Sequence, residues 1–278
     1  MKTPRIDDRD WSALSLGHRL RQLEVEGYVV LPDVLSAAEI SHLKEQTGQF
    51  ETTAVDYSVH KQVRDQIQFE GGAVTDLIAN PRALDFLRSA LGEDIIFISA
   101  DYQRCEPGFP GISLHTDGQP YGSEIFGHEG SSPIIVRLLY YLDDLTPEVS
   151  PFRVVPRSHL SLHGDANPYL RYKSHPEEVM VTLKAGSAIA LHYRAFHGNF
   201  PNTGDYPRSL ITTAYRPAWA GPVHSVAEWN AAEVEKLPAA VRPLFQDRNT
   251  RHWNFGGGNK PSGMKNDAAG INPSRWEK

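Results

Sequence analysis

The chain has 278 residues, 40% hydrophobic and 22% charged, which is the composition of a folded globular protein and excludes a disordered, collagenous or coiled-coil chain. Its net charge of −6 disfavours a broad nucleic-acid-binding surface, and its single cysteine, Cys105, excludes an intrachain disulfide and a cysteine-rich zinc site. No stretch approaches the ~20 apolar residues of a membrane span, and the N-terminus lacks a secretory signal. We therefore expect a cytoplasmic protein whose partners are neither nucleic acids nor membranes.

Helical patterns dominate the first 93 residues, and we expect them to form an N-terminal support. Leucines at positions 14, 16, 20 and 23 predict a short amphipathic helix, and residues 27–31 predict a strand. Ser36 and Glu39 match a capping box, which predicts a helix to about residue 46. Asn80 precedes a proline whose missing N–H costs nothing in a first turn, so a further helix is predicted to end at Gly92.

Short segments rich in β-branched and aromatic residues begin at about residue 94, separated by turn-forming residues, which is typical of a sandwich or barrel. The predicted strands are residues 95–99, 134–142, 152–155, 179–183, 187–192 and 209–215. Ser225 and Glu228 match another capping box and predict a late helix, and residues 256–278 predict a loop, lid or disordered tail. We expect one domain, mainly β with supporting helices, with its core at about 94–220 and the late helix and tail at about 221–278.

Three histidines have an acidic residue two positions later. The pairs are His115 with Asp117, His163 with Asp165, and His175 with Glu177. In a strand, residues two apart project to the same face, so such a pair can offer one nitrogen and one oxygen to a single metal. One histidine from a distant strand would complete the set of two histidines and one carboxylate that is diagnostic of non-haem Fe(II) oxygenases.

The surrounding sequence favours one pair over the others. His163 lies in a loop with glycine and asparagine, and a proline follows His175, whereas His115 follows a turn that runs into a strand. The distant histidine has two candidates, His192 and His197. Arg208 follows His197 and opens the next predicted strand, where a guanidinium can pair with a carboxylate, and this favours His197. The ordinary alternatives are a satisfied core histidine and a surface salt bridge.

Four ordered segments resemble the phytanoyl-CoA dioxygenase (PhyH) family of Fe(II)/2-oxoglutarate-dependent oxygenases, and together they span about residues 25–220. They are residues 27–36 before a helix, 107–108 leading into 115–117, 141–146 with 155–159, and 185–187 through 197–198 and 208 to 216–217. The resemblance implies a double-stranded β-helix, the jelly roll also found in cupins, with iron in the mouth of the barrel.

The resemblance also implies roles for individual residues. His115, Asp117 and His197 would bind Fe(II) as the catalytic centre, and Arg208 would hold the distal carboxylate of 2-oxoglutarate. Asn199 matches a position where a polar side chain often assists. Tyr102 and Arg104 are candidates for the other end of the cosubstrate, with a structural role equally open. Candidates for lining or covering the mouth, against ordinary packing, are Gln68, Phe69, Trp219, His224 and Gly256–Gly258.

The implied reaction consumes O2 and 2-oxoglutarate, releases succinate and CO2, and oxidises an unactivated C–H bond of a small molecule. Hydroxylation is the expected outcome. Desaturation, epoxidation or ring formation in natural-product biosynthesis would use the same ligands, and Asp117 argues against halogenation because halogenating relatives have a small residue there. Outside this class, the alternatives are a cupin-type metalloenzyme that does not use 2-oxoglutarate and a lectin-like binding protein.

The chain departs from the family pattern at two places. Residues 148–151 read Glu-Val-Ser-Pro where the family often has Glu-Asn-Gly, and residues 156–159 read Pro-Arg-Ser-His where it often has Pro-Gly-Ser-His. Neither departure changes a predicted metal ligand. We expect them to affect the loops on the substrate side.

Overall fold

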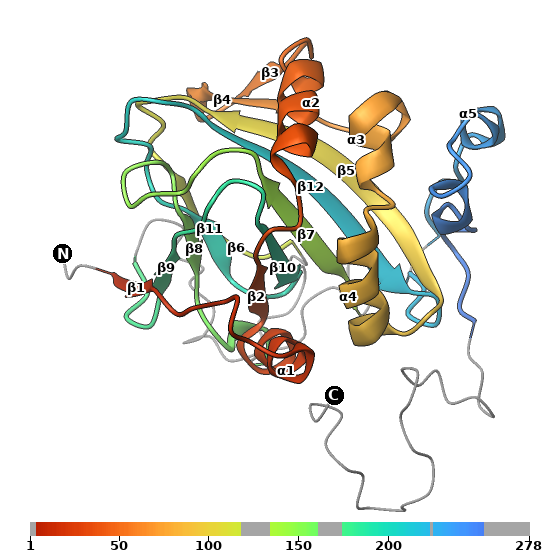
Figure 1. Cartoon of the computed structure of the whole chain (residues 1–278), viewed down its shortest axis with the longest axis horizontal. Helices are drawn as coiled ribbons and strands as arrows, with labels where there is room; N and C mark the ends of the chain where they lie inside the picture. Colours follow the sequence, from red (N-terminus) through yellow and green to blue (C-terminus); the bar gives the residue numbers. More distant parts are fainter. Residues whose placement is uncertain (1–3, 118–133, 161–173, 223–224, 253–278) are drawn as a thin grey trace, which may run out of the picture.

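The computed structural model describes residues 4–117, 134–160, 174–222 and 225–252, and its core is a pair of β-sheets (Figure 1). The five-stranded sheet has the order β1-β9-β8-β11-β6, and the seven-stranded sheet has the order β2-β10-β7-β12-β5-β4-β3. The strands are β1 Arg5–Asp7, β2 Tyr28–Leu31, β3 Thr53–Val55, β4 Ser58–Arg64, β5 Ile95–Cys105, β6 Ile112–His115, β7 Val136–Tyr141, β8 Phe152–Val154, β9 Val179–Val181, β10 Ala188–His192, β11 His197–Asn199 and β12 Arg208–Pro217.

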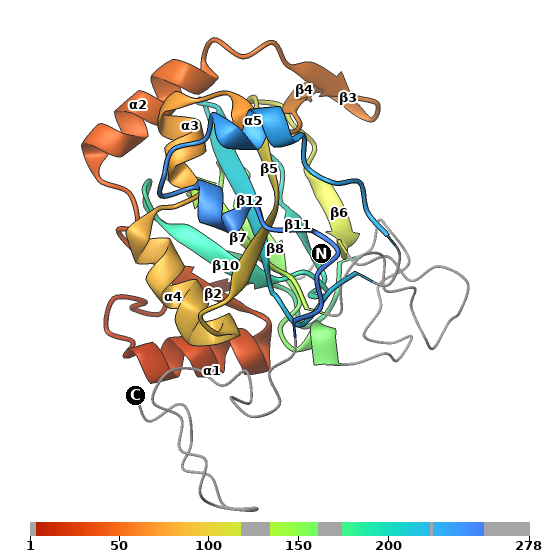
Figure 2. The same ribbon diagram turned by 90° about the vertical axis from the view of Figure 1, so that its right-hand side faces the viewer.

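Helices cover one face of the larger sheet, and the smaller sheet lies on its other side (Figures 1 and 2). They are α1 Leu16–Glu26, α2 Ala37–Thr47, α3 Gly72–Leu77, α4 Pro81–Leu91 and α5 Ala231–Glu235, with 3-10 turns η1 Ile67–Phe69, η2 Ser158–Leu160 and η4 Arg242–Leu244. The predicted capping box forms, since Ser36 accepts from the Glu39 N–H and Glu39 accepts from the Ser36 N–H. Asn80 caps α4 and Gly92 follows its last residue, as predicted.

Side chains of the larger sheet alternate between an inner face, toward the smaller sheet, and an outer face, toward the helices. Lys61, Cys105 and Arg208 pair across β4, β5 and β12 and therefore share the inner face. Tyr102 belongs to the opposite set, and its ring packs edge-on against Phe50 with centroids 5.9 Å apart. Within the described residues, no helix has the length and apolar character needed to cross a membrane.

The late helix begins later than predicted. Ser225 does not cap a helix; instead α5 starts at Ala231, and Asn230 caps it by accepting from the Ala232 N–H. The reason is tertiary, because both backbone groups of Val226 bond to the side chain of Asn249 at 2.9 and 3.0 Å. The Val226 carbonyl, which a helix beginning at this residue would use, is thereby engaged by Asn249. The predicted tail, residues 256–278, lies outside the described residues.

Candidate metal centre and cosubstrate pocket

Three of the predicted ligands converge between the two sheets. His115 at the end of β6 pairs directly with His197 at the start of β11, and Asp117 follows two residues after His115. One ligand atom from each residue lies within 4.8 Å of the others. The Nε2 atoms of His115 and His197 lie 4.0 and 3.8 Å from the Asp117 carboxylate oxygens. Among the described residues, this is the cluster of histidines and acids that can hold a metal ion.

Both histidines present the same nitrogen to the centre. Nδ1 of His115 donates to the Ser113 carbonyl at 2.9 Å, and Nδ1 of His197 donates to the Ala195 carbonyl at 3.0 Å. This leaves each Nε2 lone pair free for a metal, which is the usual way that second contacts orient histidine ligands. Burial lowers the pKa of His197 to about 4, so the imidazole is in its neutral, metal-binding form at pH 7.

Asp117 is held from two sides. Its backbone N–H donates to the Tyr193 carbonyl at 3.0 Å, and Arg137 Nη1 contacts its Oδ2, also at 3.0 Å. Burial opposes ionisation of the carboxyl, but the charge and hydrogen bond of Arg137, together with attraction to His197 and His115, outweigh it and hold the pKa of Asp117 well below its usual range. Arg137 is held in turn by Thr212 at 3.1 Å and Asp101 at 3.5 Å. Asp117 is therefore an ionised ligand, and a set of two imidazoles and one carboxylate suits Fe(II).

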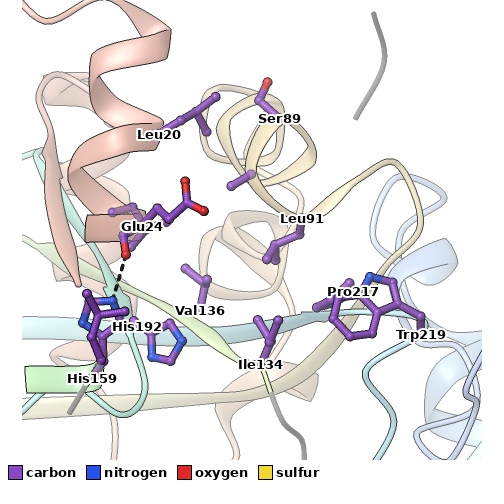
Figure 3. Close-up of a pocket in the computed structure, with 13 residues that line it drawn as sticks. Leu20, Glu24, Ser89, Leu91, Ile134, Val136, His159, His192, Pro217 and Trp219 are labelled. Atoms are coloured by element: carbon purple, nitrogen blue, oxygen red, sulfur yellow. Dashed lines mark hydrogen bonds between the residues drawn. The ribbon is translucent and has the colours of Figure 1, made fainter. Parts of the chain in front are cut away.

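The other predicted histidines do not reach this cluster. His192 points to the outer face, into a cavity of about 420 Å³ between α1, α4 and β7, where its ring lies 4.7 Å from that of His159 (Figure 3). Burial lowers the pKa of His192 to about 3. Nδ1 of His175 accepts from the Glu177 N–H in a local turn. His163 and Asp165, like His224 and Gly256–Gly258, lie outside the described residues.

Arg208 is fully buried and lacks an acidic partner within the described part of the chain. Its Nη2 contacts Cys105 Sγ at 3.0 Å and Ser150 Oγ at 3.5 Å, and its Cζ lies 5.8 Å from the centre of the Tyr141 ring. Its Nε and Nη1 have no hydrogen-bond partner. A buried cation with unused donors is costly unless an anion completes it, so this pocket fits a ligand carboxylate.

A second cation faces the same pocket and was not predicted. Lys61 is 6% exposed, lies in the row with Cys105 and Arg208, and makes no ion pair with a described residue. Burial is the main cause that lowers its pKa to about 8; Arg208 and Arg137 lower it further, whereas Cys105 and Asp117 oppose the shift. Lys61 lies in a polar strand without clear alternation, so its buried position has little signal in the sequence.

The remaining cosubstrate candidates separate into two groups. Asn199 lies two residues after His197 and, with His115 and Tyr57, lines a cavity of about 830 Å³. Tyr102 and Arg104 are on the outer face, away from the metal ligands, and Arg104 pairs with Glu106 at 2.7 Å. Among the mouth candidates, Phe69 packs against Trp229 and Phe245. Gln68 is buried, and Trp219 lines the cavity that holds His192.

Comparison with known proteins identifies the family of this chain. A family model described as phytanoyl-CoA dioxygenase (PhyH) matches residues 23–210, which include all three candidate metal ligands and Arg208. The chain belongs to the PhyH family. Ectoine dioxygenase of Sphingopyxis alaskensis is 25% identical to this PhyH chain over 224 residues, covering 68% of the chain and 72% of that protein.

Two solved structures share the fold of this PhyH chain. HygX from Streptomyces hygroscopicus, with nickel and 2-oxoglutarate bound, has a TM-score of 0.64 at 17% identity, covering 79% of the chain and 94% of HygX. The α-ketoglutarate-dependent epimerase SnoN from nogalamycin biosynthesis has a TM-score of 0.62 at 22% identity, covering 83% and 89%. With the two sheets described above, these matches confirm the predicted fold class, mainly β with a jelly-roll core.

Proposed function

We propose that this chain is an Fe(II)/2-oxoglutarate-dependent dioxygenase that oxidises, and by default hydroxylates, a C–H bond of a small molecule. The observation that carries the proposal is Arg208, a fully buried cation without an acidic partner among the described residues, in the same barrel as a cluster of two histidines and one carboxylate. A metal site alone would not require such a cation. A dicarboxylate cosubstrate that binds the metal at one end requires it at the other.

The candidate site residues have separate roles. His115, Asp117 and His197 would hold the metal, and a set of three protein ligands leaves room for the cosubstrate and O2. Arg208 and Lys61, which share a row on the inner face, would bind the distal carboxylate of 2-oxoglutarate, and Asn199 would assist from the cavity that it lines with His115. Bound iron, with 2-oxoglutarate and O2, supplies the oxidant for the C–H bond and yields succinate and CO2. The cavity of about 830 Å³ is within the range of small-molecule sites.

Two outcomes compete with hydroxylation. The solved structures that share the fold include an epimerase and a carbocyclase, so desaturation, epoxidation or ring formation is compatible with the same ligand set. A cupin-type enzyme without 2-oxoglutarate would leave Arg208 buried without its anion, and we therefore rank it lower.

The proposed function is tested by succinate formation. Anaerobically purified protein, loaded with Fe(II), is mixed with 2-oxoglutarate and O2 in the presence of a small-molecule library, and succinate is quantified. Succinate that requires iron and rises with particular library members supports the proposal. Iron-loaded protein that binds 2-oxoglutarate but oxidises neither it nor any compound would contradict it.

Lys61 gives the cosubstrate site a pH dependence. Because burial lowers its pKa to about 8, Lys61 loses its proton above that pH in the unliganded protein and then attracts a carboxylate less. We expect 2-oxoglutarate affinity to fall as the pH rises from 7 to 9. Lys61→Met should remove most of this slope and weaken binding about tenfold at pH 7. Lys184→Met, at an exposed lysine paired with Asp144, is the control.

The same shift affects stability with a defined sign. The pKa of Lys61 is below its ordinary value of 10.5, so its buried charge disfavours the folded state below about pH 8, and this penalty is relieved as the pH rises from about 8 to 10.5. Calorimetric titration with 2-oxoglutarate at several pH values measures how the affinity of the wild type and of Lys61→Met changes with pH. An unchanged slope in Lys61→Met would show that another group is responsible.

A further inference from the structure

Two residues other than glycine occupy left-handed backbone at positions where the family resemblance implies glycine. Ser150 has φ +44° and Arg157 has φ +66°. They stand at the third position of residues 148–150 and the second position of residues 156–159, the two departures from the family pattern. Glycine adopts this conformation without steric cost, but a residue with a Cβ does so only at a cost in conformational free energy. We therefore expect each side chain to make a contact that offsets this cost.

The hydroxyl of Ser150 makes such contacts. Ser150 is fully buried, and its Oγ donates to the Phe200 carbonyl at 3.1 Å and accepts from Arg208 Nη2 at 3.5 Å. Its own carbonyl accepts from Asn199 Nδ2 at 3.5 Å. Ser150 thus contacts both Arg208 and Asn199. Its hydroxyl also bonds to Phe200, the residue that follows β11, the strand that begins with His197.

The contacts of Arg157 are different. Its side chain is 60% exposed and lies 3.7 Å from Glu26, and its N–H donates to the Glu26 carbonyl. Arg157 therefore has the same type of backbone strain without a contact to the proposed cosubstrate residues. The two positions form a matched pair. A change to glycine relieves backbone strain at both, but only at Ser150 does it also remove a contact to a proposed cosubstrate residue, Arg208.

We propose that Ser150 is a positioning residue, whose hydroxyl fixes the guanidinium of Arg208 for the distal carboxylate of 2-oxoglutarate. This proposal rests on the proposed function. Arg208 Nη2 is shared between Ser150 and Cys105, and this anchoring leaves Nε and Nη1, which have no protein partner, available to the ligand. Without the hydroxyl, the Arg208 guanidinium loses one of the two described hydrogen-bond partners of its Nη2. A side chain that is already fixed in the binding orientation gives tighter binding than one that must first be ordered.

The test separates strain from positioning. Ser150→Gly should raise the midpoint of thermal unfolding of the metal-free protein by about 2–4 °C, because strain is relieved, and also weaken 2-oxoglutarate binding to the Fe(II)-loaded protein about tenfold. Arg157→Gly should raise the midpoint similarly and leave the dissociation constant within about twofold. Ser150→Ala, which keeps the Cβ and loses the hydroxyl, should weaken binding as much as Ser150→Gly without the gain in stability.

A double variant shows whether Ser150 acts through Arg208. In an Arg208→Met background, Ser150→Gly should weaken 2-oxoglutarate binding no further. The proposal is overturned if Ser150→Gly and Ser150→Ala both bind 2-oxoglutarate like the wild type, or if their effect persists without Arg208. Failure of the wild type itself to bind 2-oxoglutarate would instead contradict the proposed function, so the two failures are distinguishable.

Discussion

His197→Ala is expected to weaken Fe(II) or Co(II) binding more than about 100-fold, whereas His192→Ala should leave metal affinity within about twofold. Loss of residues that merely orient a ligand costs about 10–100-fold in metal affinity, and loss of the ligand itself should cost more. The Nε2 of His197 lies 3.8 Å from the Asp117 carboxylate, and the ring of His192 is in the cavity on the outer face of the sheet. Anaerobic Co(II) titration, followed by visible absorption, measures both variants.

The buried position of His197 requires a control for folding. Its ring is 7% exposed and stacks on Phe152 with centroids 5.9 Å apart, so alanine also leaves a cavity. His197→Gln keeps most of the volume, and thermal unfolding without metal reports on the fold alone. If His192→Ala lost the metal and a folded His197→Gln kept it, the assignment of the third ligand would be wrong.

Arg208→Met is expected to weaken 2-oxoglutarate binding about 10–100-fold while metal binding is retained. The estimate follows from hydrogen bonds to charged groups, which contribute about 1.5–3 kcal/mol, with about 1.4 kcal/mol for each factor of ten. Methionine retains the unbranched apolar stem of the arginine side chain and removes its charge. Calorimetric titration of 2-oxoglutarate into the Fe(II)-loaded variant measures the loss.

The same substitution should stabilise the protein when no cosubstrate is present. Arg208 is 0% exposed, and no carboxylate among the described residues pairs with it, so the free protein bears the cost of a desolvated charge. Replacing a buried charge with an apolar side chain of similar size should add about 1 kcal/mol or more to the free energy of unfolding. Arg64→Met, which removes an outer ion pair with Glu70, is the control. A destabilised Arg208→Met would indicate that the guanidinium is structural.

The three candidate metal ligands that the fold brings together could be predicted from the sequence, because metal binding depends on residue type and spacing. His115 and Asp117 are two residues apart, but β6 ends at His115 and Asp117 lies in the bend that follows it; Arg208 opens β12, the strand after the one that begins with His197. The family match supports the overall class for the same reason, since motifs in a fixed order are specific. The capping boxes depend on local contacts; the one at Ser36 formed, whereas at Ser225 the contacts of Val226 with Asn249 replaced it.

Faces of strands were harder to predict. Tyr102 and Arg104 alternate with Gln103 and Cys105 in β5, and a shift of one position exchanges the inner and outer faces. Both sets mix polar and apolar residues, so the sequence offered no basis for choosing between them.

A missed signal was present in β7. Arg137 is a lone charge within the apolar run of residues 134–142, and a buried charge predicts a partner, here Asp117. Its partner lies across the barrel, so the sequence alone indicates the need for a counterion but not its identity.

The central claim is that one centre binds both Fe(II) and 2-oxoglutarate. Anaerobic titration of the metal-free protein with Fe(II) and then 2-oxoglutarate tests it most directly, because chelation of iron by a keto acid gives a visible charge-transfer band. We predict a band in the wild type that is absent in His115→Ala and needs more 2-oxoglutarate in Arg208→Met. Iron binding without a band at any 2-oxoglutarate concentration would contradict the account.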